Sequence, residues 1–93
     1  MSILVRFQPS NVSKQQYESV RGDLEASGDW PADGCQLHVV FGPEDDVRVS
    51  EVWESAEKFQ AFGERLRPKM EEAGIQLSGE PEVFEDVHVV ETF

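Results

Sequence analysis

Cysteine, basic residues and long apolar runs are all scarce in this chain of 93 residues. The single cysteine, Cys35, excludes an internal disulfide framework, and with no signal-peptide pattern at the N-terminus it favours a reducing, cytoplasmic location. No apolar run approaches the ~18 residues that a membrane span needs. The chain has 8 Lys and Arg against 19 Asp and Glu, a net charge of −11, which disfavours binding to nucleic acid or to an anionic membrane surface.

The residues that are present are typical of a folded domain. Hydrophobic residues make up 39% of the chain and charged residues 29%, which is the balance of a globular rather than a disordered protein. The chain shows no linker, internal repeat or low-complexity stretch, and its length fits one domain. We therefore expect residues 1–93 to form a single acidic domain.

Hydrophobic periodicity predicts four strands and two helices. The strands are expected at residues 2–8, 35–41, 47–53 and 82–91. Ser13 begins the first helix with a capping box that Gln16 completes, and Gly28 suits the position after the last turn. Ser55 caps the second helix, and Gly74 marks the end of that helix.

The order of these elements predicts the fold. It is β-α-β-β-α-β, and each β-α-β crossover is expected to be right-handed. Both helices therefore fall on one face of a four-stranded antiparallel sheet. The predicted class is α+β, a ferredoxin-like fold with the strand order 4-1-3-2.

Apolar residues occur on both faces of the predicted sheet. The face under the helices is expected to carry Ile3, Val5, Phe7, Leu37, Val39, Phe41, Val83, Val87 and Val89. The opposite face is expected to mix apolar Leu4, Val40, Phe84 and Val90 with polar Arg6, Gln8, Gln36, His38, Asp86 and His88. Burial of these four apolar side chains would contribute roughly 1.5–3 kcal/mol each. We therefore expect a homodimer with the two sheets face to face; a monomer with scattered exposed apolar residues is the alternative.

The phase of the third strand depends on the length of the hairpin loop before it. A five-residue loop places Val47, Val49 and Glu51 on the face under the helices, whereas a four-residue loop turns Glu51 and Trp53 to the opposite face. A buried Glu51 needs a cationic partner, and Arg6 on the neighbouring strand is the nearest one. This requirement favours the four-residue loop.

The histidines His38 and His88 are the first candidates for chemistry. They fall on opposite edge strands of one chain, about 14 Å apart, so they share a site only between two copies. Asp86 and His88 lie on one strand face, but two such ligands are a weak metal signal, and no metal site is expected. No nearby basic residue would activate Cys35, which is expected to be inert.

Three short segments resemble those of a known family. They are Phe41-Gly42-Pro43 before the hairpin, Val52-Trp53-Glu54-Ser55 at the start of an aromatic-rich helix, and Ala73-Gly74-Ile75 at the end of that helix. With the element order, they resemble the dimeric α+β-barrel superfamily, in particular its antibiotic-biosynthesis-monooxygenase-like domains. The resemblance covers nearly the whole chain. It implies a homodimer whose two sheets form a barrel with a ligand cavity.

The resemblance also implies a chemistry. Some relatives oxidise polycyclic aromatic compounds without a metal or flavin, so a cofactor-independent monooxygenase acting on an aromatic substrate is the leading hypothesis. His38 would then accept a proton, Arg6 would stabilise an oxyanion, and Trp53 would stack on the substrate. Glu51 and His88 are further ligand-binding candidates. No cofactor is expected.

Two alternatives follow from the same comparison. Other relatives degrade haem, but this chain has no histidine in its second helix and no asparagine in its first strand, where that pattern has them. A non-catalytic dimerisation or regulatory module is the second hypothesis. In such a module Phe59, Phe62, Leu66 and the tryptophans would fill the space that an enzyme keeps for its substrate.

Overall fold

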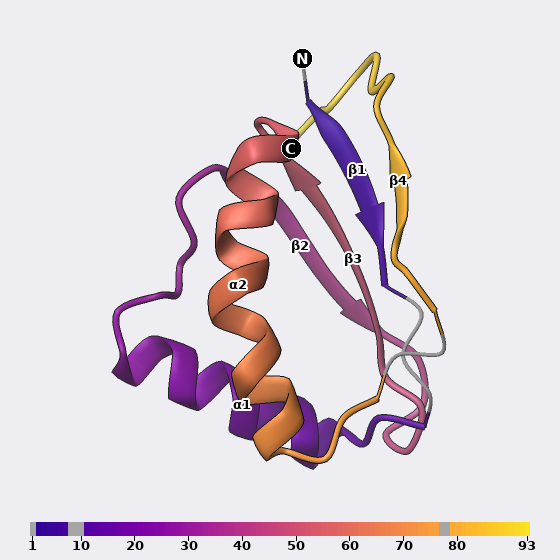
Figure 1. Ribbon diagram of the computed structural model, residues 1–93. Coiled ribbons are helices and arrows are strands. Elements are labelled where there is room, and N and C mark those ends of the chain that lie inside the picture. The colour runs from indigo at the N-terminus through magenta and orange to yellow at the C-terminus, as the bar shows by residue number, and fades with distance from the viewer. Residues whose placement is uncertain (1, 8–10, 77–78) are drawn as a thin grey trace.

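The computed structural model describes residues 2–7, 11–76 and 79–93, which form one sheet and two helices (Figure 1). The elements in chain order are β1 (Ile3–Arg6), α1 (Lys14–Ala26), β2 (Cys35–Phe41), β3 (Arg48–Trp53), α2 (Ala56–Glu72) and β4 (Glu82–Phe84). Both helices lie on the same side of the sheet, and α1 crosses beneath one end of α2 (Figure 1). The predicted order β-α-β-β-α-β is confirmed.

Both helices begin and end at the predicted signals. The Ser13 hydroxyl accepts a hydrogen bond from the Gln16 N–H at 3.0 Å, and the Gln16 side chain accepts one from the Ser13 N–H at 2.9 Å. Gly74 has a φ of +74°, and the following Ile75 N–H donates to the Met70 carbonyl at 2.9 Å. This is a Schellman ending, which a glycine at the left-handed position makes possible.

The sheet has the strand order β2-β3-β1-β4, which is the predicted 4-1-3-2 read from the other edge. All three strand pairs are antiparallel. β4 is shorter than the predicted strand at residues 82–91. Phe84 pairs with Leu4, and the two strands are antiparallel. Too few residues precede Leu4 in the chain to pair with residues 88–91.

β2 faces the opposite way from the prediction because of a β-bulge near its start, where the register with β3 shifts. A shift of one residue exchanges the two faces of a strand. His38 and Val40 therefore point toward the helices. The predicted core residues Leu37, Val39 and Phe41 point away from them and are 40%, 42% and 45% exposed.

β3 places Glu51 and Trp53 under the helices. Their partners on β1 are Val5 and Ile3, both of which are buried in the core. The prediction that Glu51 and Trp53 lie on the opposite face, with Glu51 beside Arg6, is therefore wrong.

The hairpin loop explains which part of that prediction was right. Phe41 pairs with Arg48, so six residues separate the two strands. Both six and the predicted four are even numbers. A loop of either length places His38 and Glu51 on the same face of the sheet. The relation between the two strands was correct, and the bulge turned the shared face toward the helices.

The core lies between the helices and the sheet. Its buried members are Ile3, Val5, Val20, Leu24, Trp53 and Phe62. None of the described helices is long and apolar enough to cross a membrane.

The other side of the sheet, here named the helix-free face, carries the strand residues Leu4, Arg6, Leu37, Val39, Phe41, Arg48, Ser50, Val52, Glu82 and Phe84. Leu4 and Phe84 are there as predicted. Val40 is not, because the bulge turned it toward the helices.

Several predicted positions fall outside both strand faces. The predicted core residues Val87 and Val89, and the predicted opposite-face residues Asp86, His88 and Val90, follow β4 and lie outside the strands. Val83 is on the helix-covered face, as predicted, but is 43% exposed. Gln8 lies outside the described residues.

Candidate functional site

A buried carboxylate on β3 is the centre of the candidate site. Glu51 is 3% exposed, and both of its carboxylate oxygens have partners. Oε2 lies 2.6 Å from Nδ1 of His38, and Oε1 accepts a hydrogen bond from Nε1–H of Trp53 at 3.0 Å. A carboxylate removed from water needs such partners. His38 therefore takes the place that the sequence analysis assigned to Arg6.

The backbone register brings this pair together. His38 and Glu51 are direct partners on β2 and β3, where side chains of opposite residues lie within contact distance. The bulge at the start of β2 is what aims His38 toward the helices. The one-residue bulge thus determines whether the His38 imidazole faces solvent or contacts the Glu51 carboxylate.

Helix α1 adds two polar groups to the pair. Tyr17 and Arg21 are four residues apart, so they lie on one face of the helix. The Tyr17 hydroxyl oxygen lies 2.7 Å from Nε2 of His38, and Nη1–H of Arg21 donates to the same oxygen at 3.2 Å. The hydrogen bond to Tyr17 is the main cause that raises the pKa of Arg21 above its ordinary value. The guanidinium therefore stays charged beside the hydroxyl.

Trp30 fixes the histidine ring from the side. Its ring centroid lies 4.7 Å from that of His38 at an interplanar angle of 62°, which is an edge-to-face contact. The Arg21 guanidinium lies 5.7 Å from the centroid of the Trp30 ring, within cation–π range. Trp30 also packs on Phe62 of the core. These contacts hold the imidazole in one orientation.

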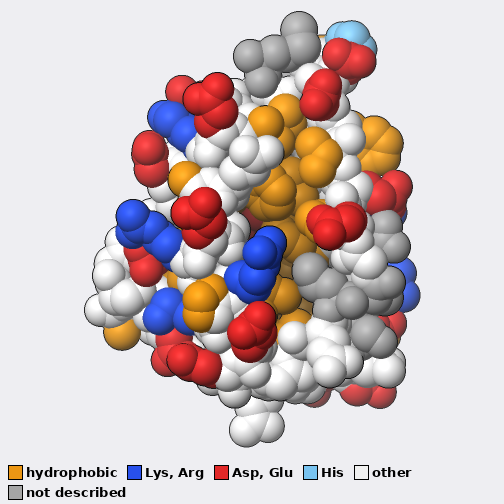
Figure 2. Space-filling view, viewed as in Figure 1, with side chains coloured by type: hydrophobic (Ala, Val, Ile, Leu, Met, Phe, Trp, Pro, Cys, Tyr) orange, Lys and Arg blue, Asp and Glu red, His pale blue; other side chains and the backbone are white. Residues whose placement is uncertain are grey.

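A cavity of about 90 Å³ lies between the sheet and the two helices. Its lining surface is almost entirely apolar and includes Phe7, Val20, Val49, Phe62, Leu66 and Met70. Tyr17, Arg21, His38 and Glu51 are also lining residues, but their polar groups are engaged with one another. Figure 2 shows hydrophobic side chains exposed along the seam between α2 and the strands, with charged side chains on both sides of the seam. The cavity is therefore an apolar space beside a cluster of polar side chains.

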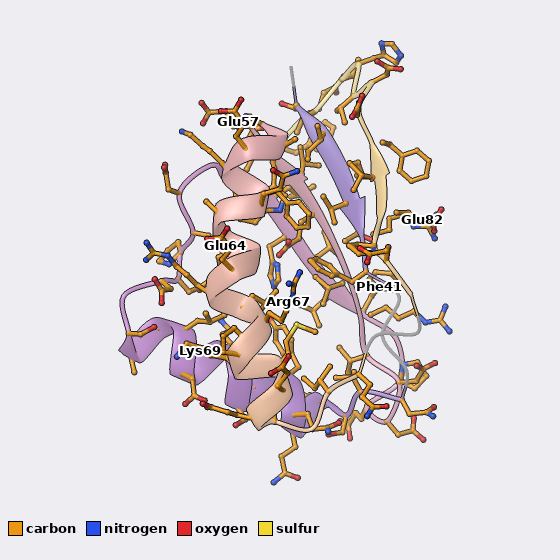
Figure 3. All side chains as sticks on the ribbon, in the orientation of Figure 1. Phe41, Glu57, Glu64, Arg67, Lys69 and Glu82 are labelled. Carbon is orange, nitrogen blue, oxygen red and sulfur yellow. The ribbon has the colours of Figure 1, made fainter. Side chains whose placement is uncertain are left out.

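A second cation lies near this seam. Figure 3 shows Arg67 on the side of α2 that faces the strands, whereas Glu64 and Lys69 lie on its outer side. Within the described residues, Arg67 belongs to none of the ion pairs. Although the chain carries a net charge of −11, the cation Arg21 lines the cavity and Arg67 lies beside the seam.

Cys35 lies near the site but is poorly suited to be a nucleophile. Its burial, and then the negative charge of Glu51, raise the pKa of the thiol to about 11. The thiol therefore stays protonated at neutral pH, and the thiolate is the reactive form.

The structure brings together only some of the residues that the sequence singled out. His38 and Glu51 meet at the cavity, and Trp53 lies behind Glu51 with no exposed surface, so its ring packs in the core. Arg6 is exposed on the helix-free face, opposite Ser50, and does not join His38 within one chain. His88 is exposed and lies beyond β4.

No three His, Cys, Asp or Glu side chains of residues 2–7, 11–76 and 79–93 lie close enough together to hold a metal ion. The buried polar side-chain atoms of the same residues all have hydrogen-bond partners.

Solved structures share this fold over nearly the whole chain. SnoaB, a cofactor-independent oxygenase from Streptomyces nogalater, is 16% identical and superimposes with a TM-score of 0.58, covering 98% of this chain and 96% of its own. The chain has the fold of an antibiotic biosynthesis monooxygenase. Candidate monooxygenases of that class from Deinococcus radiodurans and Chloroflexus aurantiacus agree: they are 15% and 17% identical, with TM-scores of 0.59 and 0.57.

The coverage is similar for these two structures. The Deinococcus protein covers 100% of this chain and 99% of its own, and the Chloroflexus protein 97% and 95%. No protein-family model matches the chain, and no curated protein sequence matches it. The resemblance seen in the sequence is therefore confirmed for the fold.

The sequence did not indicate that Tyr17, Arg21 and Trp30 gather around His38. One signal was available for the first two: Tyr17 and Arg21 have helical spacing beside the apolar Val20 and Leu24, so they border the buried face of α1. Nothing in the local sequence shows that this border meets His38, because the contact depends on the bulge in β2.

Proposed function

We propose that the chain is an enzyme that removes a proton from an aromatic substrate and lets dioxygen oxidise the resulting anion without a metal or organic cofactor. The observation that supports this most is the 2.6 Å pair of Glu51 and His38 among the residues that line an apolar cavity. A histidine held by a buried carboxylate is a suitable general base.

The pair works through the two nitrogens of the imidazole. An ionised Glu51 can only accept a hydrogen bond, so Nδ1 of His38 carries the proton that is shared with it. Nε2 is then the basic nitrogen and faces Tyr17 at the cavity. When Nε2 takes up a proton, the negative charge of Glu51 stabilises the imidazolium, as the carboxylate of a catalytic triad does.

The walls of the cavity indicate the substrate class. Apolar side chains favour a hydrocarbon ring system, and the charged Arg21 favours an oxygen that becomes negative in the reaction. An aromatic ketone or phenol with an acidic methylene group combines both features. The printed name of SnoaB, a cofactor-independent oxygenase, is consistent with such chemistry.

The reaction balances with dioxygen as the only oxidant. A base removes one proton from the methylene carbon, and the carbanion gives its electrons to dioxygen and forms a carbon–oxygen bond. Protonation yields a hydroperoxide. Loss of the second methylene proton and cleavage of the O–O bond then release water and leave a ketone. The sum is one CH₂ group plus O₂ giving one C=O group plus H₂O.

The cavity volume limits how the substrate binds. At about 90 Å³ it is smaller than the ~300–1,000 Å³ of sites that enclose a drug-sized ligand. The reacting edge of a ring system would enter, and the remainder would lie along the apolar seam beside α2. The same small volume favours the alternative function, a non-catalytic dimerisation or regulatory module, in which Phe62 and Leu66 simply pack the interior.

A homodimer is part of the proposal. Leu37, Val39, Phe41 and Phe84 are 40–46% exposed on the helix-free face. Burial of apolar surface at roughly 25 cal/mol per Å² favours a second copy against this face. Two sheets packed in this way would form the α+β barrel.

Oxygen uptake tests the proposal. Anthrone, a tricyclic ketone with an acidic methylene group, is offered to the wild type, to Glu51→Gln and to the matched control Glu64→Gln on the outer side of α2. We expect the wild type and Glu64→Gln to consume one O₂ for each anthraquinone formed. Glu51→Gln should be at least ~100-fold slower, because the base His38 loses the carboxylate that stabilises its imidazolium. No uptake by the wild type, or equal rates in all three proteins, contradicts the proposal; the first result favours the non-catalytic module.

A further inference from the structure

The basic nitrogen of His38 is already occupied. Nδ1 is engaged by Glu51 at 2.6 Å, and Nε2 lies 2.7 Å from the Tyr17 hydroxyl oxygen. Trp30 packs edge-to-face on the ring, with the centroids 4.7 Å apart. A substrate therefore has no free nitrogen of His38 to approach, although both side chains line the cavity, and it meets Tyr17, which occupies Nε2, first.

We propose that Tyr17 is the catalytic residue that contacts the substrate, and that it takes an acidic proton and passes its own to His38. The inference rests on the proposed function and deepens it. His38 and Glu51 then form the second and third members of a relay that begins at Tyr17.

The proton transfer balances along this chain of contacts. The substrate O–H or C–H bond breaks as an O–H bond forms on Tyr17. The original Tyr17 O–H bond breaks as an N–H bond forms on Nε2 of His38. The products are a substrate anion and an imidazolium paired with Glu51, so the total charge is unchanged.

Arg21 supports the relay from the same helix. Its Nη1–H donates to the Tyr17 oxygen at 3.2 Å, which stabilises negative charge on that oxygen during the transfer. Contacts with Glu25, 3.3 Å from Nε, and with the face of Trp30 hold the guanidinium in place. Arg21 is therefore a positioning and charge-stabilising residue beside Tyr17.

A chromogenic phenol can test the relay without knowledge of the natural substrate. p-Nitrophenol is yellow as its phenolate and nearly colourless as the neutral phenol. At a pH below the probe's own pKa, binding to the wild type should produce the phenolate band. Binding itself is followed separately by the quenching of tryptophan fluorescence, which reports on Trp30 at the cavity.

The variants separate the relay from binding. We expect Tyr17→Phe to bind p-nitrophenol within about threefold of the wild type but to lose at least ~10-fold of the phenolate band, because an aromatic ring remains and the hydroxyl does not. Arg21→Gln should also weaken the band. The matched control Arg65→Gln, an exposed arginine of α2 that pairs with Asp29 at 2.6 Å, should leave it unchanged.

Each result decides between the relay and its rivals. The relay is overturned if Tyr17→Phe keeps the full phenolate band. It is also overturned if the wild type binds p-nitrophenol without colour or fails to bind it. The proposed function is judged separately by oxygen uptake. If Tyr17→Phe oxidises anthrone as fast as the wild type while Glu51→Gln does not, the relay is wrong and the Glu51–His38 base stands. Circular dichroism of each variant verifies that it is folded.

Discussion

Each face of the sheet departs at a few positions from the usual relation between burial and polarity. The face under the helices contains an acid and a histidine, Glu51 and His38, in the interior of the molecule. The helix-free face carries Val39, Phe41 and Phe84 with 42–46% of their surface exposed. Folding of one chain alone would be served better by the opposite arrangement.

At these positions neither face adds to the stability of the single chain. A buried carboxylate is weak evidence for stability, because its desolvation offsets much of its attraction to its partners, and apolar side chains of similar volume are often as stable. An exposed apolar face likewise adds nothing to folding. We therefore propose a binding role for each face: a small molecule under the helices, and a second copy on the helix-free face.

The largest effect should come from breaking the buried pair. His38→Leu leaves the Glu51 carboxylate with the Trp53 N–H as its remaining partner, and we expect a loss of about 3–5 kcal/mol in the free energy of unfolding. The double variant His38→Leu/Glu51→Leu should recover most of this loss, because no charge remains buried. Urea unfolding at constant protein concentration measures both. A double variant no more stable than the single one would mean that the pair itself stabilises the fold.

A charge introduced on the helix-free face should weaken dimer association rather than destabilise the folded chain. Val39→Glu places two like charges near a two-fold interface, and we expect dimer dissociation to become at least ~100-fold easier, about 2.7 kcal/mol. Sedimentation equilibrium gives the dissociation constant. Gln60→Glu, which adds the same charge on an exposed position of α2, is the control. Equal dissociation constants for both variants would show that the face is not the interface.

The helix-covered face should also protect its thiol. With a pKa of about 11, the Cys35 thiol carries roughly 100-fold less thiolate near pH 8 than an unshifted one, so iodoacetamide should react slowly in the folded protein and quickly in urea. The rate should rise as the pH approaches 11. Glu51→Gln removes a negative charge that raises this pKa, so it should increase the rate. Equal reaction rates of Cys35 in the folded and the unfolded protein would contradict a buried thiol beside Glu51.

The smallest effect is expected away from both faces. Gly63 lies inside α2, and a Cβ built on it meets no atom within 4 Å. Gly63→Ala should therefore raise the free energy of unfolding by about 0.5–1 kcal/mol through helix propensity alone. Thermal unfolding measures the gain. Oxygen uptake and the dimer dissociation constant should stay as in the wild type, and a loss of stability would point to a contact that the open position does not reveal.

The sequence predicted the elements and their order because those depend on local signals. The capping box of Ser13 and Gln16 and the glycine at position 74 gave the limits of the helices, and the alternating residues gave the strands. The assignment of faces failed in β2, where one bulged residue exchanged them. No residue type near the start of β2 marks that bulge.

The candidate site was predictable only in part for the same reason. His38 and Glu51 were both identified, and the need of a buried carboxylate for a partner was correctly recognised. The choice of Arg6 as that partner followed from the wrong face. Tyr17 and Arg21 come from a helix far away in the sequence, so their contact with His38 could be found only from the three-dimensional arrangement.

The most direct test of the central claim compares ligand-induced stabilisation in two proteins of similar stability. The claim is that the polar pair under the helices serves a ligand rather than the fold. The change in melting temperature is measured with anthrone and with p-nitrophenol for the wild type and for His38→Leu/Glu51→Leu. The account predicts that the ligands raise the melting temperature of the wild type and leave the double variant unchanged. Equal shifts in both proteins, or none in either, would contradict it.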